Sequence, residues 1–532
     1  MSGLGTLVRL ALRRNRWFLT VWLLALVVVV PATAAAYEQV VPDLGQGRLV
    51  IEGLANNPTM RAMLGPPFSL TEPGGFTVWR VGTFVATLAG VMSVLGTVRL
   101  TRADEEAGRT ELLRSGVVGR HAPLAAATLV GLGACTLLGL LVSGAMVAVG
   151  TDPTGSAAFG LGVALTAGMF VGVGALAAQL TGSARAARGI GLAVLGVAYL
   201  VRAVADGVPA DSPLRRLQWA SPVEWMALAR PYADERWSVL LLPAVLTAVL
   251  VALAVWAEAR RDHGSGPWLP RPGPPTAGEL LSSPSGLAWR LQRGTVLAWA
   301  VALAVFAGAI GSLTPSFAAM FSDLPQLEEL LLRMGAGAEQ LTQGFYVAML
   351  SILVLVIAAH GLQLLGRLQH EETEGRAGIV LSTDVRRTRF ALSHTLLALG
   401  APTVLLLVCG ALLAVPQAVD DGSWAVVTDV VAGAAALLPG VWLVVGLGLL
   451  LHGWVPQAGW IAWLVVGWSL VITWIGALLS LPDWLLELTP FARLPQLPVE
   501  DMRWLPVVVT TVVAAALLAV GLAGYRRRDL EA

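Results

Sequence analysis

The sequence of 532 residues contains no lysine, so all 35 of its basic residues are arginines. This absence excludes a Walker A lysine, a Schiff-base lysine and a lysine general base from the chain. Charged residues of both signs are scarce, at 13%, whereas 56% of the residues are apolar and the mean hydropathy is +0.73. This composition is typical of a polytopic membrane protein.

Cysteines and metal-ligand patterns are also scarce. Cys135 and Cys409 lie in apolar segments, where we expect them to pack without forming a disulfide or a metal site. The apolar segments contain no pair of carboxylates and no Cys/His ligand spacing, so we predict no catalytic and no metal site. Membrane proteins that use proton or sodium gradients usually carry ionisable residues at mid-membrane. Their near absence predicts that the driving energy comes from elsewhere.

Long apolar runs dominate what is present. Segments of about 20 residues, the length that crosses a membrane as a helix, predict an all-α fold with twelve transmembrane helices. They lie near residues 17–36, 77–98, 122–149, 158–180, 187–206, 238–257, 294–313, 345–366, 391–415, 426–451, 456–480 and 504–524. Residues 3–16 alternate apolar side chains with arginines, which predicts an amphipathic helix leading into the first span.

A polar motif after the second span recurs after the eighth. Asp-Glu-Glu-Ala-Gly-Arg at 104–109 and Glu-Glu-Thr-Glu-Gly-Arg at 371–376 are 267 positions apart, and Arg120 and Arg387 keep the same spacing. The chain is therefore a tandem duplication. We predict a first six-span half at 1–257, a cytoplasmic linker rich in proline and glycine at 258–286, and a second six-span half at 287–532.

The distribution of charge orients these spans. With the N-terminus inside, most arginines fall in the inner segments and most acidic residues in the outer ones, as the positive-inside rule requires. Both termini and both copies of the motif then lie in the cytoplasm. Because six spans return the chain to its starting side, the two halves have parallel orientations.

The motif predicts a short amphipathic helix that projects from the membrane. Asp104, Glu105 and Glu106 place negative charge at a helix start, where the helix dipole favours it. Gly108 permits close approach of another backbone, while Arg109 and Arg120 offer donors to acceptors on a partner. The alternative is a solvated cytoplasmic loop that only obeys the charge rule.

These features together resemble the permease of ABC-2 type exporters. The resemblance rests on the amphipathic start, the long first outer loops ending in Gly75-Phe76 and Gly344-Phe345, the duplicated motif, and Ser221-Pro222 before the sixth span. The fused twelve-span form is similar to actinobacterial permeases of multidrug or polyketide-antibiotic exporters. The resemblance implies two parallel six-helix repeats of the type V exporter kind.

The resemblance also implies a role and a partner. The chain would be the transport subunit, itself no enzyme and without a cofactor, of an exporter for hydrophobic or amphipathic compounds, with a part in antibiotic resistance. A separate ABC ATP-binding subunit, in two copies, would hold ATP and Mg. The chain itself would lie in the plasma membrane of a bacterium, in contact with its lipids, and would bind no nucleic acid. The coupling residues would be Asp104, Glu105, Glu106, Gly108, Arg109, Arg120, Glu371, Glu372, Gly375, Arg376 and Arg387. Because Gly378 replaces Glu111 and Asp384 replaces Val117 in the second copy, the halves are expected to couple unequally.

We expect spans 2 and 5 of each half to open a substrate cavity alternately on the two sides of the bilayer. We predict that its lining draws on Trp79, Phe84, Met92, Phe345, Tyr346 and Met349, and that it suits an uncharged ligand because an unpaired buried charge is costly. Helix packing is the simpler role for any one of these side chains. Two alternatives from other classes are a major-facilitator-type secondary transporter and a polytopic membrane enzyme acting on lipid-linked substrates. A lipid or envelope exporter of the same architecture stays open.

Overall fold

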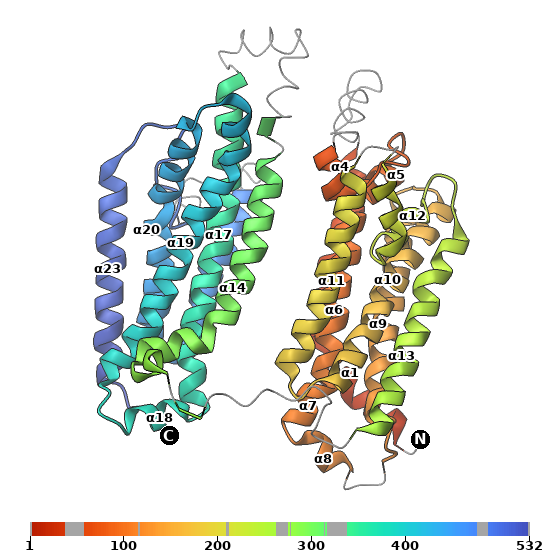
Figure 1. The fold of residues 1–532 in the computed structure, drawn as a ribbon, viewed down its shortest axis with the longest axis horizontal. Helices are drawn as coiled ribbons and strands as arrows, with labels where there is room; N and C mark the ends of the chain where they lie inside the picture. Colours follow the sequence, from red (N-terminus) through yellow and green to blue (C-terminus); the bar gives the residue numbers. More distant parts are fainter. Residues whose placement is uncertain are drawn as a thin grey trace. The chain divides into compact units, whose positions relative to one another are not determined.

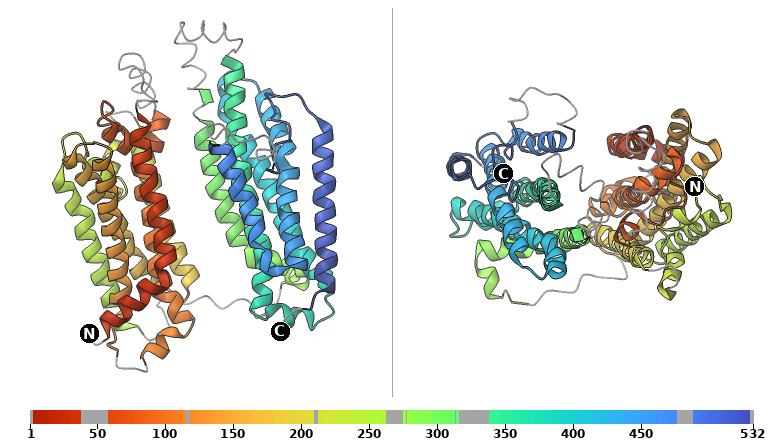
Figure 2. Two further views of the ribbon diagram at one scale, coloured as in Figure 1. Left: turned by 180° about the vertical axis from the view of Figure 1, so that it is seen from behind. Right: turned by 90° about the horizontal axis from the view of Figure 1, so that it is seen from above.

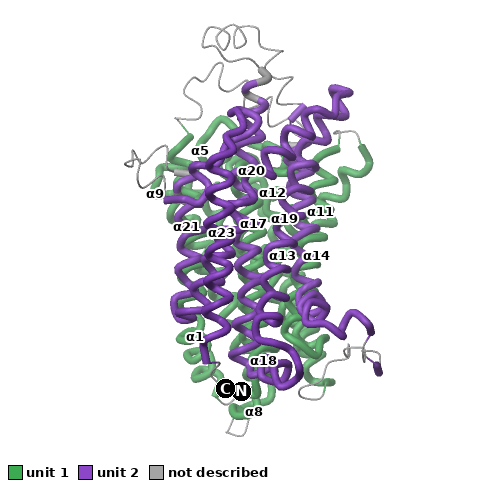
Figure 3. Tube along the Cα trace, turned by 90° about the vertical axis from the view of Figure 1, so that its left-hand side faces the viewer, with its two compact units in different colours: residues 1–272 green, residues 273–532 purple. Residues whose placement is uncertain are grey.

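The computed structural model describes residues 3–37, 58–114, 118–208, 212–261, 275–276, 278–312, 314–315, 338–475 and 488–529. These residues form helices and no strand, which confirms the predicted all-α class. The chain divides into two compact units, Met1–Pro272 and Gly273–Ala532 (Figure 1, Figure 3). Each unit is described by itself.

The described residues of the first unit form a bundle with six long helices. Their bounds are α1 Leu4–Ala35, α6 Thr83–Leu100, α9 Ala122–Ala148, α10 Pro153–Leu180, α11 Ala184–Gly207 and α13 Leu241–Arg260. The expected amphipathic segment 3–16 and the first span form one continuous helix, α1. Before α6, the short helix α5 (Pro73–Thr77) and the π-helical turn η1 (Val78–Gly82) extend the second span toward one end of the bundle.

Helix α10 occupies the centre of this unit and packs against α6, α9, α11 and α13. Small residues allow the close approach, because a Cβ added to Gly139 of α9 would lie 2.5 Å from the carbonyl oxygen of Gly160 in α10. Phe159 and Phe170 of α10 are fully buried in the surrounding apolar clusters. The core of the unit thus follows one helix made largely of small residues.

The second unit repeats this plan. Its long helices are α14 Pro284–Gly311, α17 Ala338–Thr373, α19 Arg387–Asp421, α20 Ala425–Trp454, α21 Trp460–Ile475 and α23 Trp504–Arg527. Helix α20 takes the central place and packs against α17, α19, α21 and α23. The predicted span 456–480 begins as α21, and its last residues lie outside the described part.

Each unit has one end that carries the polar motif, here called the motif end (Figure 1, Figure 2). In the first unit it holds the N-terminus, α7 (Arg102–Glu106) and α8 (Arg109–Arg114); in the second it holds α18 (Arg376–Leu381) and the C-terminus. The opposite end of the first unit is closed by short helices, among them α4 (Pro58–Leu64), η2 (Pro213–Ala220) and α12 (Trp225–Leu228).

Eleven helices in the described residues are long and apolar enough to cross a membrane. They match eleven of the twelve predicted spans, and the largest difference is that the helices extend beyond the apolar core by several residues. Together with the absence of strands in the described part, this shows a multi-pass helical membrane protein.

Candidate functional site

The motif folds as two helical segments with a break at glycine. In the first copy α7 ends at Glu106 and α8 begins at Arg109, with Gly108 between them at φ +70°. In the second copy Gly375, at φ +69°, separates the end of α17 from α18. Glycine is favoured in this left-handed conformation because it has no Cβ. A Cβ added at Gly108 would meet nothing within 4 Å among the described residues, so within the chain the backbone conformation accounts for this glycine, and the close approach of another backbone stays a prediction.

Asp104 connects α7 to the first helix of its unit. Its two carboxylate oxygens accept hydrogen bonds from Nη1 and Nη2 of Arg14 in α1, at 2.8 and 2.9 Å. Arg109, the first residue of α8, donates through Nε to the same carboxylate at 2.9 Å. This two-pronged geometry is the strong form of an arginine–carboxylate pair. Asp104 therefore holds α1, α7 and α8 together.

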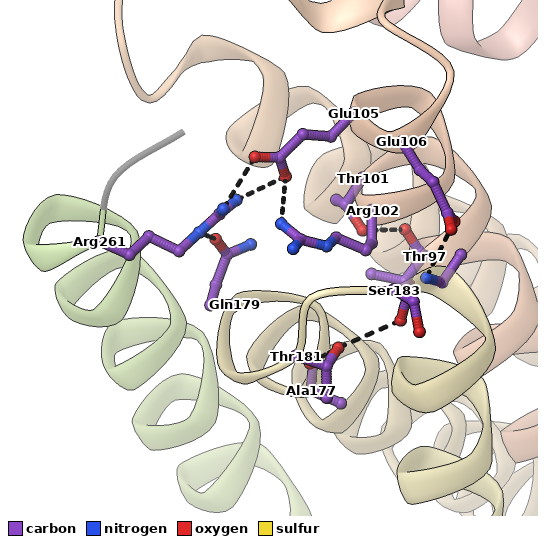
Figure 4. Close-up of polar contacts among 11 residues, drawn as sticks. Thr97, Thr101, Arg102, Glu105, Glu106, Ala177, Gln179, Thr181, Ser183 and Arg261 are labelled. Carbon is purple, nitrogen blue, oxygen red and sulfur yellow. Dashed lines mark hydrogen bonds and ion pairs between the residues drawn. The ribbon is translucent and has the colours of Figure 1, made fainter. Parts of the chain in front are cut away.

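Glu105 connects α7 to two further helices (Figure 4). Its carboxylate lies 2.6 Å from Nη2 of Arg261, which follows α13, and 3.0 Å from Nη1 of Arg102. Arg261 also donates through Nε to Oε1 of Gln179, near the end of α10, at 2.7 Å. The Glu105 side chain is only 6% exposed, so this is a buried ion pair whose charges need each other.

Glu106 completes a row of three anchored carboxylates. Its Oε2 accepts a hydrogen bond of 3.1 Å from the backbone N–H of Ala184, the first residue of α11 (Figure 4). A carboxylate is stabilised there because the first N–H groups of a helix lack intrahelical partners and carry the positive end of the dipole. Three consecutive acidic residues thus tie α7 to α1, α10, α11 and α13.

The second copy repeats the central ion pair. Glu372 pairs with Nη2 of Arg528, which follows α23, and lies 3.1 Å from Nε2 of His452 at the end of α20. Arg528 donates through Nη1 to the carbonyl oxygen of His452 at 2.9 Å. Arg261 and Arg528 are 267 positions apart, so the duplication preserved this contact. We call the pairs Glu105–Arg261 and Glu372–Arg528 the two latches.

The neighbouring acid differs between the copies. Glu371, the counterpart of Asp104, pairs with Arg367 of its own helix α17 at 2.5 Å and with Arg376 of α18 at 3.0 Å. Glu371 also raises the pKa of Arg376 by hydrogen bonding to its guanidinium. Among the described contacts, this carboxylate does not reach the first helix of its unit. The second copy is therefore anchored to fewer helices.

The second arginine of each motif caps the sixth span. Arg120 donates through Nη2 to the carbonyl oxygen of Ala259 at 3.0 Å, and Arg387 donates through Nη1 to that of Arg528 at 2.9 Å. These acceptors belong to the same chain, although we predicted acceptors on a partner for Arg120. Cations at a helix C-terminus satisfy unpaired carbonyls and the dipole.

The motif also exposes one apolar side chain in each copy. Leu112 of α8 is 77% exposed and Ile379 of α18 is 72% exposed, and the two are 267 positions apart. The adjacent Leu113 instead packs on the cluster around Leu7 and Ala122. Ser115 and Val117 lie outside the described residues. In the described part of the structure, each short helix therefore has an apolar side chain that is largely exposed.

The predicted cavity residues differ in how deeply they are buried. Trp79, Met92 and Tyr346 are buried, Phe345 and Met349 are half-buried, and Phe84 is exposed. Trp79 donates through Nε1 to the carbonyl oxygen of Gly65 at 3.2 Å and packs on Phe76. Trp79 and Met92 thus pack inside the first unit, whereas Phe84 faces outward. Their role in a cavity stays a prediction.

Sequence reasoning missed the partners of the motif. The motif acids or their arginines contact Arg14, Gln179, Arg261, His452 and Arg528, and none of these contacts was predicted. A signal existed for one pair, because Arg261 and Arg528 have the same 267-residue spacing as the motif itself.

Two comparisons with known proteins agree with this architecture. Residues 281–526 match the family model for the C-terminal domain of the multidrug efflux system permease Rv1217c. Over its whole length the chain is 38% identical to the multidrug efflux system permease protein Rv1217c of Mycobacterium tuberculosis (strain ATCC 25618 / H37Rv), of which it covers 96%. The match confirms the resemblance to actinobacterial ABC exporter permeases and a role as a transport subunit that works with other transporter components. The chain therefore belongs to the family of multidrug efflux system permeases.

Proposed function

We propose that this permease is driven by ATP hydrolysis in a separate ABC ATP-binding subunit and exports hydrophobic or amphipathic compounds. The mycobacterial relative is a multidrug efflux system permease, which supports export of such compounds. The chain has no lysine for a Walker A motif, so ATP and Mg would bind to the partner. The motif ends and both termini would face the cytoplasm of a bacterium, where the partner is located.

The observation that carries the proposal is the pair of equivalent exposed side chains, Leu112 and Ile379. Both side chains are more than 70% exposed, and their recurrence at the same position of the repeat, rather than exposure alone, supports a surface that binds a partner. Two such anchors at equivalent repeat positions fit two copies of one partner, each receiving one helix. We therefore assign α8 and α18 as the coupling helices.

The latches provide the route from these helices into the membrane. A displacement of α8 would be transmitted across Gly108 to α7. The acidic side chains of α7 connect it to α1, α10, α11 and α13. In this assignment Asp104, Glu105 and Glu106 transmit the motion within the permease, and the partner is contacted by the exposed face of α8. Buried ion pairs suit this task because their separation is costly, so the connected elements move together.

The two copies would transmit motion unequally. The first motif is anchored to four long helices, whereas the second is anchored in the described residues to α20 and α23. The departures Gly378 for Glu111 and Asp384 for Val117 add to this difference. Loss of the first coupling helix should therefore reduce transport more than loss of the second.

The decisive experiment replaces each anchor with a charge. Leu112→Asp and Ile379→Asp are introduced singly and together, and the permease is reconstituted with its ATP-binding subunit in liposomes. We expect reduced co-purification, loss of substrate-stimulated ATPase activity in the double variant, and a larger loss for Leu112→Asp than for Ile379→Asp. Leu280→Asp is the matched control, because Leu280 is 62% exposed near the same end of the second unit but outside α18.

Two results would reject the proposal. Undiminished stimulation in the double variant would show that α8 and α18 are not coupling helices. Transport by the permease alone, dependent on a proton gradient and not on ATP, would instead indicate the secondary transporter.

A further inference from the structure

Three charged side chains are fully buried near the opposite end of the first unit. Arg202 and Asp206 lie one turn apart in α11, and Glu224 precedes α12; the side chain of each is 0% exposed. Asp206 Oδ2 lies 3.5 Å and Glu224 Oε2 lies 4.0 Å from the same atom, Nε of Arg202. The two carboxyl groups are therefore neighbours on one side of one guanidinium.

The hydrogen-bond partners of this cluster are incomplete. Gln218 donates through Nε2 to Asp206 Oδ1 at 2.7 Å, and Arg202 donates through Nη2 to the carbonyl oxygens of Ala62 and, at 3.0 Å, Met63. In the part of the chain that the structure describes, no donor reaches either oxygen of Glu224 or Oδ2 of Asp206. A buried ionised carboxylate without a donor is severely destabilising, and native proteins rarely contain one.

One proton can give one oxygen of each acid a hydrogen-bond partner. If Glu224 is protonated, its O–H can donate to Asp206 Oδ2, so that a previously unpartnered oxygen on each residue gains a hydrogen bond. The remaining single negative charge is then balanced by Arg202. We infer that Asp206 and Glu224 form a proton-binding site that holds one shared proton while this end of the unit is closed.

The surrounding charges are consistent with this assignment. Arg61 on α4 and Arg215 on η2 face the cluster, and Tyr199 lies on α11 with its ring 4.8 Å from the guanidinium of Arg202. Burial, followed by the negative charge of Asp206, raises the pKa of Glu224 well above its ordinary value, although Arg202 opposes the shift. Two carboxyl groups beside one buried arginine behave in this way because both cannot ionise together at low cost.

Short helices seal the site from water. Tyr199 donates through its hydroxyl to the carbonyl oxygen of Met63, at the end of α4, at 3.0 Å. Ser221 donates through Oγ to the carbonyl oxygen of Ala198 at 2.7 Å, which holds the segment between η2 and α12 against α11. We call α4, η2 and α12 the cap. Displacement of the cap would hydrate the carboxyl groups and release the proton.

The direction of the pH dependence follows from this release. The closed cap binds one proton more than the open cap at pH values between the ordinary pKa of glutamate and the raised pKa of Glu224. Opening therefore becomes easier as the pH rises, by up to about tenfold per pH unit in that window. This coupling acts on the permease itself and is independent of the identity of its energy source.

Infrared spectroscopy of the full-length chain in lipid nanodiscs tests the shared proton. We expect a protonated-carboxyl C=O band at pH 7 that is lost in both Glu224→Gln and Asp206→Asn, because each variant leaves one carboxyl for one arginine. Asp234→Asn is the control: the exposed Asp234 is bound by Arg230 and Arg236, and hydrogen bonding to Arg230 lowers its pKa. A wild-type band that survives in both variants, or no such band, would overturn the inference.

Hydrogen exchange tests the link to the cap and does not depend on the spectroscopic assignment. We expect the opening of helices 58–64 and 213–220, measured by amide exchange and corrected for the intrinsic exchange rate, to become easier as the pH rises. In the wild-type chain the increase should reach up to about tenfold per pH unit. In Glu224→Gln, which resembles the protonated state and should keep the fold, this dependence should disappear. An unchanged pH dependence in Glu224→Gln would refute proton-linked opening.

Discussion

The first latch makes a quantitative prediction about Glu105. Replacing Glu105 with glutamine keeps the shape of the side chain but leaves Arg102 and Arg261, which are 1% and 10% exposed, without their carboxylate. Removing the carboxylate from a buried ion pair costs about 3–5 kcal/mol, because the desolvation of the arginine charge is then no longer offset by that carboxylate. This free-energy loss should weaken the attachment of α7 to α10 and α13.

The assay is amide hydrogen exchange of α7 and of the α13 end in the full chain in nanodiscs. At about 1.36 kcal/mol for each factor of ten, the lost stability corresponds to exchange that is faster by roughly 100- to 5,000-fold. Glu111→Gln is the matched control, since Glu111 is an exposed acid on α8 and its replacement should change exchange by less than about twofold.

A double-variant cycle makes the test specific to the latch. Arg261→Gln alone should cost less than Glu105→Gln, because Glu105 keeps Arg102. The double variant should lose less than the sum of the two single losses, yet remain weakened, because Arg102 still lacks its carboxylate. Additive losses, or a Glu105→Gln effect no larger than that of Glu111→Gln, would refute the latch.

Two further predictions concern the motif glycines and the predicted cavity. Gly108→Ala and Gly375→Ala should each destabilise the helix break by about 1–2 kcal/mol, since alanine is strained at positive φ, whereas Gly378→Ala inside α18 should be neutral or stabilising. Local hydrogen exchange checks this, and equal effects at all three positions would contradict it. Trp79→Phe should lower thermal stability by about 1 kcal/mol through loss of its hydrogen bond to Gly65, whereas Phe84→Leu should leave stability unchanged and alter substrate-stimulated transport. A transport effect of Trp79→Phe without loss of stability, together with loss of stability in Phe84→Leu, would contradict this assignment.

Much of the fold follows from patterns that are local in the sequence. Apolar runs long enough to cross a membrane predict helices because a backbone in lipid must satisfy its own hydrogen bonds. The repeat offset places equivalent residues of the two halves in equivalent elements, as Leu112 and Ile379 demonstrate. The positions of the helix ends were predicted less accurately, because polar residues extend the helices beyond the apolar core. Residues Arg102–Glu106 do so after the second span.

The contacts within the site depend on tertiary structure instead. Nothing in the neighbourhood of Glu105 predicts that its partner is Arg261, because α9, α10, α11 and α13 must pack before the two ends meet. The same holds for Glu224, an ordinary loop acid in the sequence that becomes fully buried beside Arg202 and Asp206.

The sequence alone therefore determined the membrane class, the duplication and the position of the motif, since composition and period are properties of the chain itself. Only the folded bundle decided which charges are paired, which are sealed from water and which apolar side chains stay outside. The physical reason is that burial and ion pairing depend on distances between helices that are far apart in the chain.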